Sequence, residues 1–249
     1  MSVKINLSGK TTLITGATRG IGKAIQKTFG IANSSLILTG TDSSKISELN
    51  KTEKRPNVKW VTADFSSSEG IELFINKIKA EDKIDICINN AGINIIKNHH
   101  EYSLEEIQRL TNINLLAPCA LSQHIAKKMG ENNFGRIVNI ASIWSEISKS
   151  RRSIYSMSKS GLVGLTRSLA IEYGSKNVLI NAVSPGFTKT ELTDKSLSSD
   201  QKKKLIRQIP LRRFAKPSEV AKTTLFLCSD LNSYITGQNI VADGGFTIV

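Results

Sequence analysis

Short apolar runs alternate with longer amphipathic segments along the whole 249-residue chain, and this alternation constrains the fold more than any other sequence feature. The runs are rich in Ile and Val and are bounded by polar residues, Gly or Pro; they include TTLIT, SLILT, VKWVTA, IDICIN, RIVNIAS and VLINAVS. Such runs predict parallel strands buried on both faces. The helical patterns between them, among them Leu104 to Met129 and Ser153 to Tyr173, predict a single α/β domain over residues 1–249.

A glycine-rich segment, TGATRGIG at residues 15–22, follows the first predicted strand, Thr11 to Thr15. Gly16, Gly20 and Gly22 allow the backbone to turn tightly and to approach a pyrophosphate. The helix predicted to begin near Gly20 would face that pyrophosphate with free N–H groups. Glycines with this spacing also serve helix–strand packing, but their position after the first strand favours dinucleotide binding.

The end of the second predicted strand, SLILT, bears on which dinucleotide binds. An acidic residue at that position holds the ribose 2′-hydroxyl of NAD, and here the position falls on Gly40. Arg19, within the glycine-rich segment, offers a cation to a 2′-phosphate, so the sequence favours NADP(H). Asp42 is the alternative, because a shift of two residues would bring its carboxylate into the NAD position.

Four polar residues suggest acid–base chemistry. Tyr155 and Lys159 are spaced i,i+4 and share one face of the helix predicted over Ser153 to Tyr173. Ser142 ends the strand RIVNIAS, and Asn114 lies in the helical stretch TNINLLAP. Each residue has a purely structural interpretation when taken alone: a surface pair, a capped strand end, or an amide at a helix kink.

Together the four residues predict a mechanism for a carbonyl substrate. A phenol has a pKa of about 10, and a nearby ammonium lowers it. Tyr155 would give a proton to a carbonyl oxygen as hydride arrives, and Ser142 would hydrogen-bond the same oxygen. Lys159 would hold the nicotinamide ribose and tune Tyr155, while Asn114 would fix a water that links Lys159 to solvent.

The order and spacing of these motifs resemble the short-chain dehydrogenase/reductase family over essentially the whole chain. The matching motifs are TGATRGIG at 15–22, Asp64 after the third strand, NNAG at 89–92, Asn114, Ser142, YSMSK at 155–159 and SPGFTKT at 184–190. The resemblance implies a Rossmann-type, doubly wound parallel sheet of seven strands in the order 3-2-1-4-5-6-7, with helices on both faces. It also implies a substrate lid over about residues 188–213.

The resemblance further assigns the site residues. It implies a catalytic tetrad of Asn114, Ser142, Tyr155 and Lys159, and no metal. The cofactor-binding residues that it implies, together with those from the glycine-rich segment, are Gly16, Thr18, Arg19, Gly20, Ile21, Gly22, Thr41, Asp64, Phe65, Asn89, Ala91, Gly92, Tyr155, Lys159, Pro185, Gly186 and Thr188. A homotetramer is implied as well, with contacts through the C-terminal strand and two long helices.

Within the family the chain looks most like the 3-oxoacyl-[acyl-carrier-protein] reductases, which predicts NADPH-dependent reduction of a 3-oxoacyl thioester. Their acidic carrier protein would suit the formal net charge of +13. The loop from Trp144 to Arg152 departs from that group, because Trp144, Glu146, Arg151 and Arg152 replace small residues. A sugar, a polyol or a surface-glycan precursor is therefore the alternative substrate.

Cysteine spacing and hydrophobicity argue against metal-binding, thiol-redox, secreted and membrane-spanning proteins. Cys87, Cys119 and Cys228 lie far apart without a CxxC motif, so neither a zinc site nor a redox pair is expected. The N-terminus lacks the apolar run of a signal peptide, and no stretch is long enough to span a bilayer. We expect a cytoplasmic enzyme with no membrane partner. Nucleic-acid binding through the basic clusters, Lys149 to Arg152 and Gln201 to Arg213, is the non-enzymatic alternative, which an intact tetrad disfavours.

Overall fold

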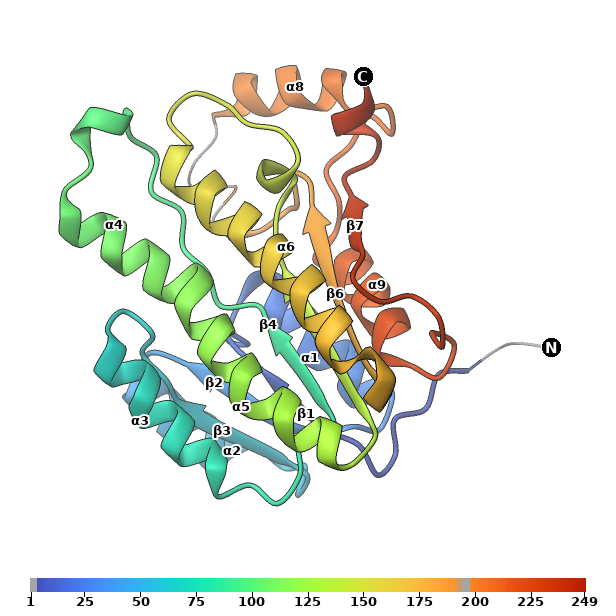
Figure 1. Ribbon diagram of the computed structural model, residues 1–249. Coiled ribbons are helices and arrows are strands. Elements are labelled where there is room, and N and C mark those ends of the chain that lie inside the picture. The colour runs from blue at the N-terminus through green and yellow to red at the C-terminus, as the bar shows by residue number, and fades with distance from the viewer. Residues whose placement is uncertain (1–3, 192, 194–197) are drawn as a thin grey trace.

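Seven parallel strands form one sheet in the order β3-β2-β1-β4-β5-β6-β7 (Figure 1). The computed structural model describes residues 4–191, 193 and 198–249. The strands are β1 (Thr11–Ile14), β2 (Ser35–Gly40), β3 (Val58–Thr62), β4 (Ile86–Asn89), β5 (Gly135–Ile140), β6 (Val178–Pro185) and β7 (Asn239–Ala242). Every neighbouring pair is parallel. The predicted fold class and strand order are thus confirmed.

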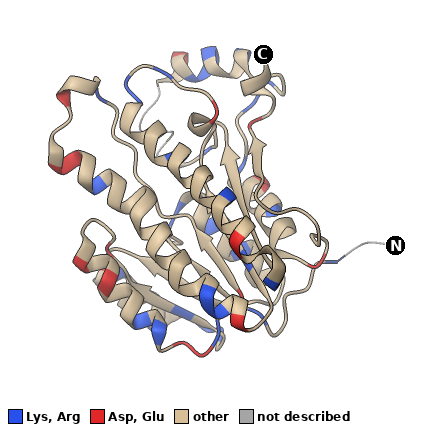
Figure 2. Ribbon diagram, in the orientation of Figure 1, with Lys and Arg blue, Asp and Glu red and all other residues tan. Residues whose placement is uncertain are grey.

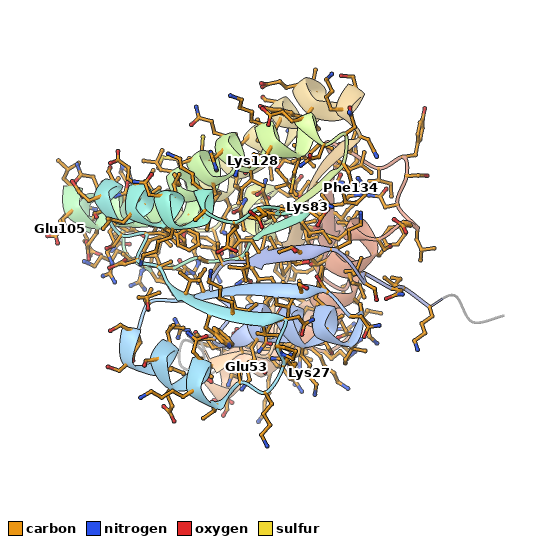
Figure 3. All side chains as sticks on the ribbon, turned by 90° about the horizontal axis from the view of Figure 1, so that it is seen from below. Lys27, Glu53, Lys83, Glu105, Lys128 and Phe134 are labelled. Atoms are coloured by element: carbon orange, nitrogen blue, oxygen red, sulfur yellow. The ribbon has the colours of Figure 1, made fainter. Side chains whose placement is uncertain are left out.

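Helices cover both faces of the sheet, as Figure 3 shows from below. One face carries α1 (Gly20–Ile31), α2 (Ser43–Thr52) and α9 (Pro217–Cys228); the other carries α3 (Ser68–Lys79), α5 (Ala117–Glu131) and α6 (Ser153–Tyr173). Alternate strand residues supply the two cores: Leu13 and Cys87 pack on the α3–α5–α6 side, and Ile14 and Ile88 on the other. Burial on both faces explains why the strands are continuous apolar runs.

The helical stretch predicted from Leu104 to Met129 contains an interruption. The structure has α4 (Leu104–Thr111), a π-helical turn over Asn112–Leu116, and then α5. Pro118 lies at the start of α5 and has no N–H to donate to the carbonyl four residues earlier, at Asn114. The N–H of Ala117 instead donates to the Asn112 carbonyl, five residues back, which widens this turn.

The segment predicted to form a lid, about residues 188–213, follows β6. Residues 192 and 194–197 lie outside the described residues, so the prediction can be compared with the structure only for the rest of the segment. The described part contains α8 (Ser199–Gln208), which begins with a capping box between Ser198 and Gln201. Figure 2 shows that α8 carries Lys and Arg, next to the C-terminus. Arg213, at the end of the predicted segment, forms a 2.7 Å ion pair with Glu219.

The carboxyl ends of the strands define where a site can lie. In a doubly wound sheet the ligand crevice opens where the strand order reverses, which here is between β1 and β4. The loops after β1, β4, β5 and β6 all reach this edge, together with the first turns of α1 and α6. Among the described residues, no helix combines the length and apolar character needed to cross a membrane.

Candidate active site

The turn between β1 and α1 brings backbone close to backbone. Gly16 and Gly20 have φ of +66° and +55°, a region that favours glycine. A Cβ on Gly22 would lie 2.2 Å from the Gly16 carbonyl oxygen. The first turn of α1 has no acidic residue, and the N-cap residue, Arg19, has no side-chain acceptor for the N–H groups of the helix. Its N–H groups and dipole are therefore available to an anion.

This turn forms one wall of a cleft of about 1090 Å³. Predicted cofactor residues that line it are Gly16, Thr18, Arg19, Gly20, Ile21, Gly22, Thr41, Asp64, Phe65, Ala91 and Gly92. The cleft lies at the switch point of the sheet and offers a helix N-terminus, the Phe65 ring and the exposed guanidinium of Arg19. These groups suit the phosphates, the adenine and a 2′-phosphate of a dinucleotide, respectively.

The end of β2 shows whether Gly40 or Asp42 occupies the position that distinguishes NAD from NADP. Gly40 is the last residue of β2, and a Cβ there would lie 2.6 Å from Thr18 Cγ2 and 3.0 Å from Ile46 Cδ1. An acidic side chain at this position would require both neighbours to move. Asp42 does not line the cleft, because its Oδ1 caps α2 by accepting from the Lys45 N–H at 3.0 Å. Arg19 is exposed and lines the cleft.

The NNAG motif places its two asparagines in opposite directions. Asn89 is buried and donates to Asn139 Oδ1 at 2.8 Å, behind the cleft. Asn90 lines the cleft, and its Nδ2 donates to the carbonyls of Thr15 and Gly16 at 2.9 and 3.0 Å. Asn90 therefore holds the glycine-rich turn in shape, a role that sequence reasoning missed. Two adjacent asparagines at a strand end alternate in direction, and the sequence alone does not say which one faces the ligand.

Tyr155 and Lys159 lie one turn apart on α6, and Lys159 Nζ is 5.8 Å from the centroid of the Tyr155 ring. Lys159 is buried, and its Nζ donates to the Ile140 carbonyl at the end of β5 at 2.8 Å. Ser142 follows β5 and accepts from the Trp144 N–H at 3.3 Å. The helix α6 and the end of β5 therefore bring the three predicted residues together.

Burial dominates the electrostatics of this group. It raises the pKa of Tyr155, while the hydrogen bond with Ser142 and the charge of Arg152 oppose the rise. The lowered pKa expected from the Tyr155–Lys159 pair is thus not found in the protein alone, because burial outweighs the neighbouring donors. Burial also lowers the pKa of Lys159 to about 8. At neutral pH both side chains are protonated.

Asn114 is buried in the π-helical turn and holds the loop after β4. Its Oδ1 accepts from the Ile93 N–H at 2.9 Å, and its Nδ2 donates to the Ile93 carbonyl at 2.9 Å and to Ser158 Oγ at 3.2 Å. A Cβ on the adjacent Gly92 would lie 3.4 Å from Asn114 Oδ1 and 3.5 Å from Lys159 Nζ. Asn114 thus connects the cleft wall to α6; a water linking Lys159 to solvent stays a prediction.

The end of β6 carries the last predicted residues, Pro185, Gly186 and Thr188. Pro185 ends the strand, the Gly186 N–H donates to the Ala242 carbonyl at 3.0 Å, and Thr188 Oγ1 donates to the Gly186 carbonyl at 3.1 Å. These residues lie beyond the cleft lining, as do Tyr155 and Lys159. Within the described part of the chain, no group of three His, Cys, Asp or Glu side chains is arranged to hold a metal.

Known proteins resemble this chain over nearly its whole length. Residues 16–247 match the family model described as "Enoyl-(Acyl carrier protein) reductase". The 3-oxoacyl-[acyl-carrier-protein] reductase FabG of Aquifex aeolicus is 40% identical over 247 residues, which cover 98% of this chain and 99% of that protein. Glucose 1-dehydrogenase 2 of Bacillus subtilis is 33% identical over 249 residues, covering 98% and 96%.

A solved structure from Beutenbergia cavernae, assigned as an NAD(P)-dependent gluconate 5-dehydrogenase with NADP bound at low occupancy, has the same fold. It superposes with a TM-score of 0.91 at 31% identity and covers 99% of this chain and 100% of that one. Carrier-protein reductases and sugar or sugar-acid dehydrogenases are therefore both among the similar proteins.

Proposed function

The chain belongs to the short-chain dehydrogenase/reductase family, and on this premise we propose that it catalyses NADPH-dependent reduction of a ketone to a secondary alcohol. The observation that carries the proposal is the group at the end of β5, where Tyr155 hydrogen-bonds with Ser142 and lies near the buried Lys159, which is itself next to the cleft wall at Gly92. Tyr155 is the proton donor, and the other two side chains assist it.

The protonation states support reduction. A raised pKa keeps Tyr155 as a phenol at neutral pH, so it holds the proton that a reduced carbonyl oxygen needs. Ser142 donates to the same oxygen as negative charge develops. Lys159 carries a positive charge below a pH of about 8 and stabilises the phenolate that remains. NADPH, when bound in the cleft, supplies the hydride.

Two features of the cleft support NADPH over NADH. Gly40 carries no acidic side chain that would repel a 2′-phosphate, and Arg19 is exposed in the cleft lining, where it can approach one. The relative from Beutenbergia cavernae binds NADP. We assign the residues from Gly16 to Gly22 to the pyrophosphate, and Asp64 and Phe65 to the adenine.

Two substrate classes follow from different observations. The similarity to FabG favours a 3-oxoacyl thioester carried by an acidic acyl carrier protein, which the net charge of +13 would attract. The loop from Trp144 to Arg152 favours the second class, a sugar, a polyol or a glycan precursor, because it places the Arg152 guanidinium near Tyr155 and the Trp144 indole against Phe187.

The test is a turnover assay with the purified chain, NADPH and an acetoacetyl thioester, next to a panel of ketoses and oxo acids. We expect oxidation of NADPH with at least one ketone. Tyr155→Phe is expected to lower kcat by about 10²- to 10⁴-fold, the range for a lost general acid, with an unchanged Kd for NADPH. Near-normal turnover by Tyr155→Phe would refute the role of Tyr155, and no turnover of any ketone by the wild type would refute the reductase.

A further inference from the structure

Arg152 carries a guanidinium of which two nitrogens have no acceptor in the described part of the chain. The side chain is partly buried, and its Nε and Nη1 atoms are shielded from solvent. Across the ranges that the structure describes, neither nitrogen has a hydrogen-bond partner. Burial lowers the pKa of this guanidinium, which means that its charge is poorly solvated. A buried cation without an acceptor is costly, so such a group points to a ligand that completes it.

The position of Arg152 relates it to the reacting atoms. Arg152 immediately precedes α6, so it lies about one helical turn before Tyr155. Its charge opposes the rise in the pKa of Tyr155, and Tyr155 and Tyr102 in turn oppose the lowering of the pKa of Arg152. Tyr102 is fixed in turn, because its hydroxyl donates to the Ile95 carbonyl at 2.6 Å. Arg152 therefore lies near Tyr155 and near Tyr102, which is tied to the segment that follows β4.

The surrounding acids do not neutralise it. The first turn of α6 contains no acidic residue. Glu101 accepts from the backbone and side chain of Asn98 at 3.0 and 2.9 Å. Glu146 accepts from Asn239 Nδ2 at 2.6 Å. The carboxylates of Glu101 and Glu146 are thus engaged with other residues, and the guanidinium keeps its hydrogen-bonding capacity for another anion.

The neighbouring arginine is different and serves as a control. Arg151 is exposed, its φ is +67°, and its Nη2 donates to the Ile96 carbonyl at 3.4 Å. A non-glycine residue in this region carries backbone strain, which is compatible with a turn that directs the next side chain inward. Arg151 thus contacts the loop after β4, whereas the Arg152 guanidinium is shielded from solvent and its charge acts on Tyr155.

We propose that Arg152 binds an anionic group of the substrate, either a carboxylate or a phosphate, that is attached to the same carbon chain as the ketone. This inference rests on the proposed function, because Tyr155 defines where the reacting carbonyl lies. A planar guanidinium holds a carboxylate or phosphate through two parallel hydrogen bonds, which also fixes the orientation of the ketone. The substrate is then an oxo acid or a ketose phosphate, and the product the corresponding hydroxy compound.

A matched substrate series tests the proposal. It pairs acetoacetate with its methyl ester, and a ketose phosphate with the free ketose, each assayed with NADPH and the full chain. The variants are Arg152→Gln, Arg152→Lys and, as the control, Arg151→Gln. For the anionic member of a pair we expect Arg152→Gln to lower kcat/KM by about 30-fold or more, as for a buried charge pair that loses one partner. The neutral member changes by less than about threefold, and Arg152→Lys recovers part of the loss.

A second measurement does not depend on turnover. We expect succinate to bind the complex with NADP⁺ and to inhibit in competition with the ketone, and Arg152→Gln to abolish both effects. An unchanged Kd for NADPH in each variant establishes that the fold is intact. The two substrate pairs show which anion Arg152 binds. The group is a carboxylate if Arg152→Gln affects acetoacetate more than its methyl ester, and a phosphate if it affects the ketose phosphate more than the free ketose.

The outcomes distinguish this inference from the proposed function. Equal losses for charged and neutral ketones, no loss at all, or reduction of neutral thioesters alone would overturn the role of Arg152 while leaving the reductase in place. If the wild type reduces no ketone, the proposed function fails. If Arg152→Gln abolishes succinate binding, the anion site is still supported. If succinate binds Arg152→Gln as well as the wild type, the anion site is refuted.

Discussion

Burial acts in opposite directions on Tyr155 and Lys159, and this difference shapes the chemistry at the residue scale. It raises the pKa of Tyr155 and lowers the pKa of Lys159 to about 8, because in each case it disfavours the charged form. The phenol is therefore kept as a proton donor, while the ammonium stays charged only up to mildly alkaline pH. Both side chains are therefore protonated up to about pH 8, and we expect reduction to be efficient below that pH.

The first prediction concerns pH. Lys159 is protonated below about pH 8 and loses its charge as the pH rises through that value, well below the 10.5 of a free lysine. We expect kcat for ketone reduction to fall above about pH 8, since a neutral amine no longer stabilises the phenolate. The measurement is a pH profile of kcat at saturating NADPH. Tyr155 does not titrate there, because its pKa is raised above its usual range, so a profile that stays flat well above pH 8 would contradict the role of Lys159.

Arg19 carries the second prediction. Arg19→Ala is expected to weaken NADPH about tenfold or more, since a charge-assisted hydrogen bond contributes roughly 1.5–3 kcal/mol, and to leave NADH almost unchanged. Kd values from quenching of protein fluorescence would show this. The control is Lys23→Ala, which removes the same charge from an exposed position of α1 outside the cleft lining. Equal losses for both cofactors would mean that Arg19 does not contact the 2′-phosphate.

At the scale of elements, the sequence predicts most strands and helices because their boundaries are local. The helix over Ser153 to Tyr173 was predicted with the bounds that α6 has. The π-helical turn was not predicted, because it depends on a single missing N–H at Pro118 within an otherwise helical pattern. The opposite directions of Asn89 and Asn90 depend on strand pairing. The lack of acceptors for Nε and Nη1 of Arg152 depends on which groups the surrounding loops bring next to that side chain. These are tertiary facts that no local pattern contains.

The turn between β1 and α1 gives the third prediction. In Gly22→Ala the new methyl group would lie 2.2 Å from the Gly16 carbonyl, and no rotation of a side chain relieves a clash with backbone. The turn must open, so we expect Gly22→Ala to lose NADPH binding while the protein still folds. Isothermal titration calorimetry together with thermal unfolding would separate these effects. Gly174→Ala is the control, because its Cβ would meet nothing within 4 Å. Unchanged NADPH binding by Gly22→Ala would show that the close approach is dispensable.

At the scale of the whole molecule, exposed apolar side chains remain on α6 and at the C-terminus. On α6, Met157 is 48% exposed and Ile171 is 86% exposed; at the end of the chain, Ile248 and Val249 are 85% and 83% exposed. Met157 and Ile171 are fourteen residues apart, about four helical turns, so they lie on one face of α6. Gly164 is exposed midway between them, and a Cβ on it would meet nothing within 4 Å. A stripe of this kind, with a small residue at its centre, favours close packing of a second helix.

The last prediction is that the protein is a homotetramer in which this face of α6 is buried. Ile171→Glu would place a carboxylate without a partner inside that interface, and the cost of desolvating it is several kcal/mol, enough to dissociate the contact. We expect sedimentation velocity to give a tetramer for the wild type and a dimer or monomer for Ile171→Glu. Leu73→Glu is the matched control: Leu73 is 63% exposed on α3, away from this face, and its variant should stay tetrameric. If Ile171→Glu kept the wild-type mass at micromolar concentration, α6 would not form the contact, and a monomeric wild type would refute the tetramer altogether.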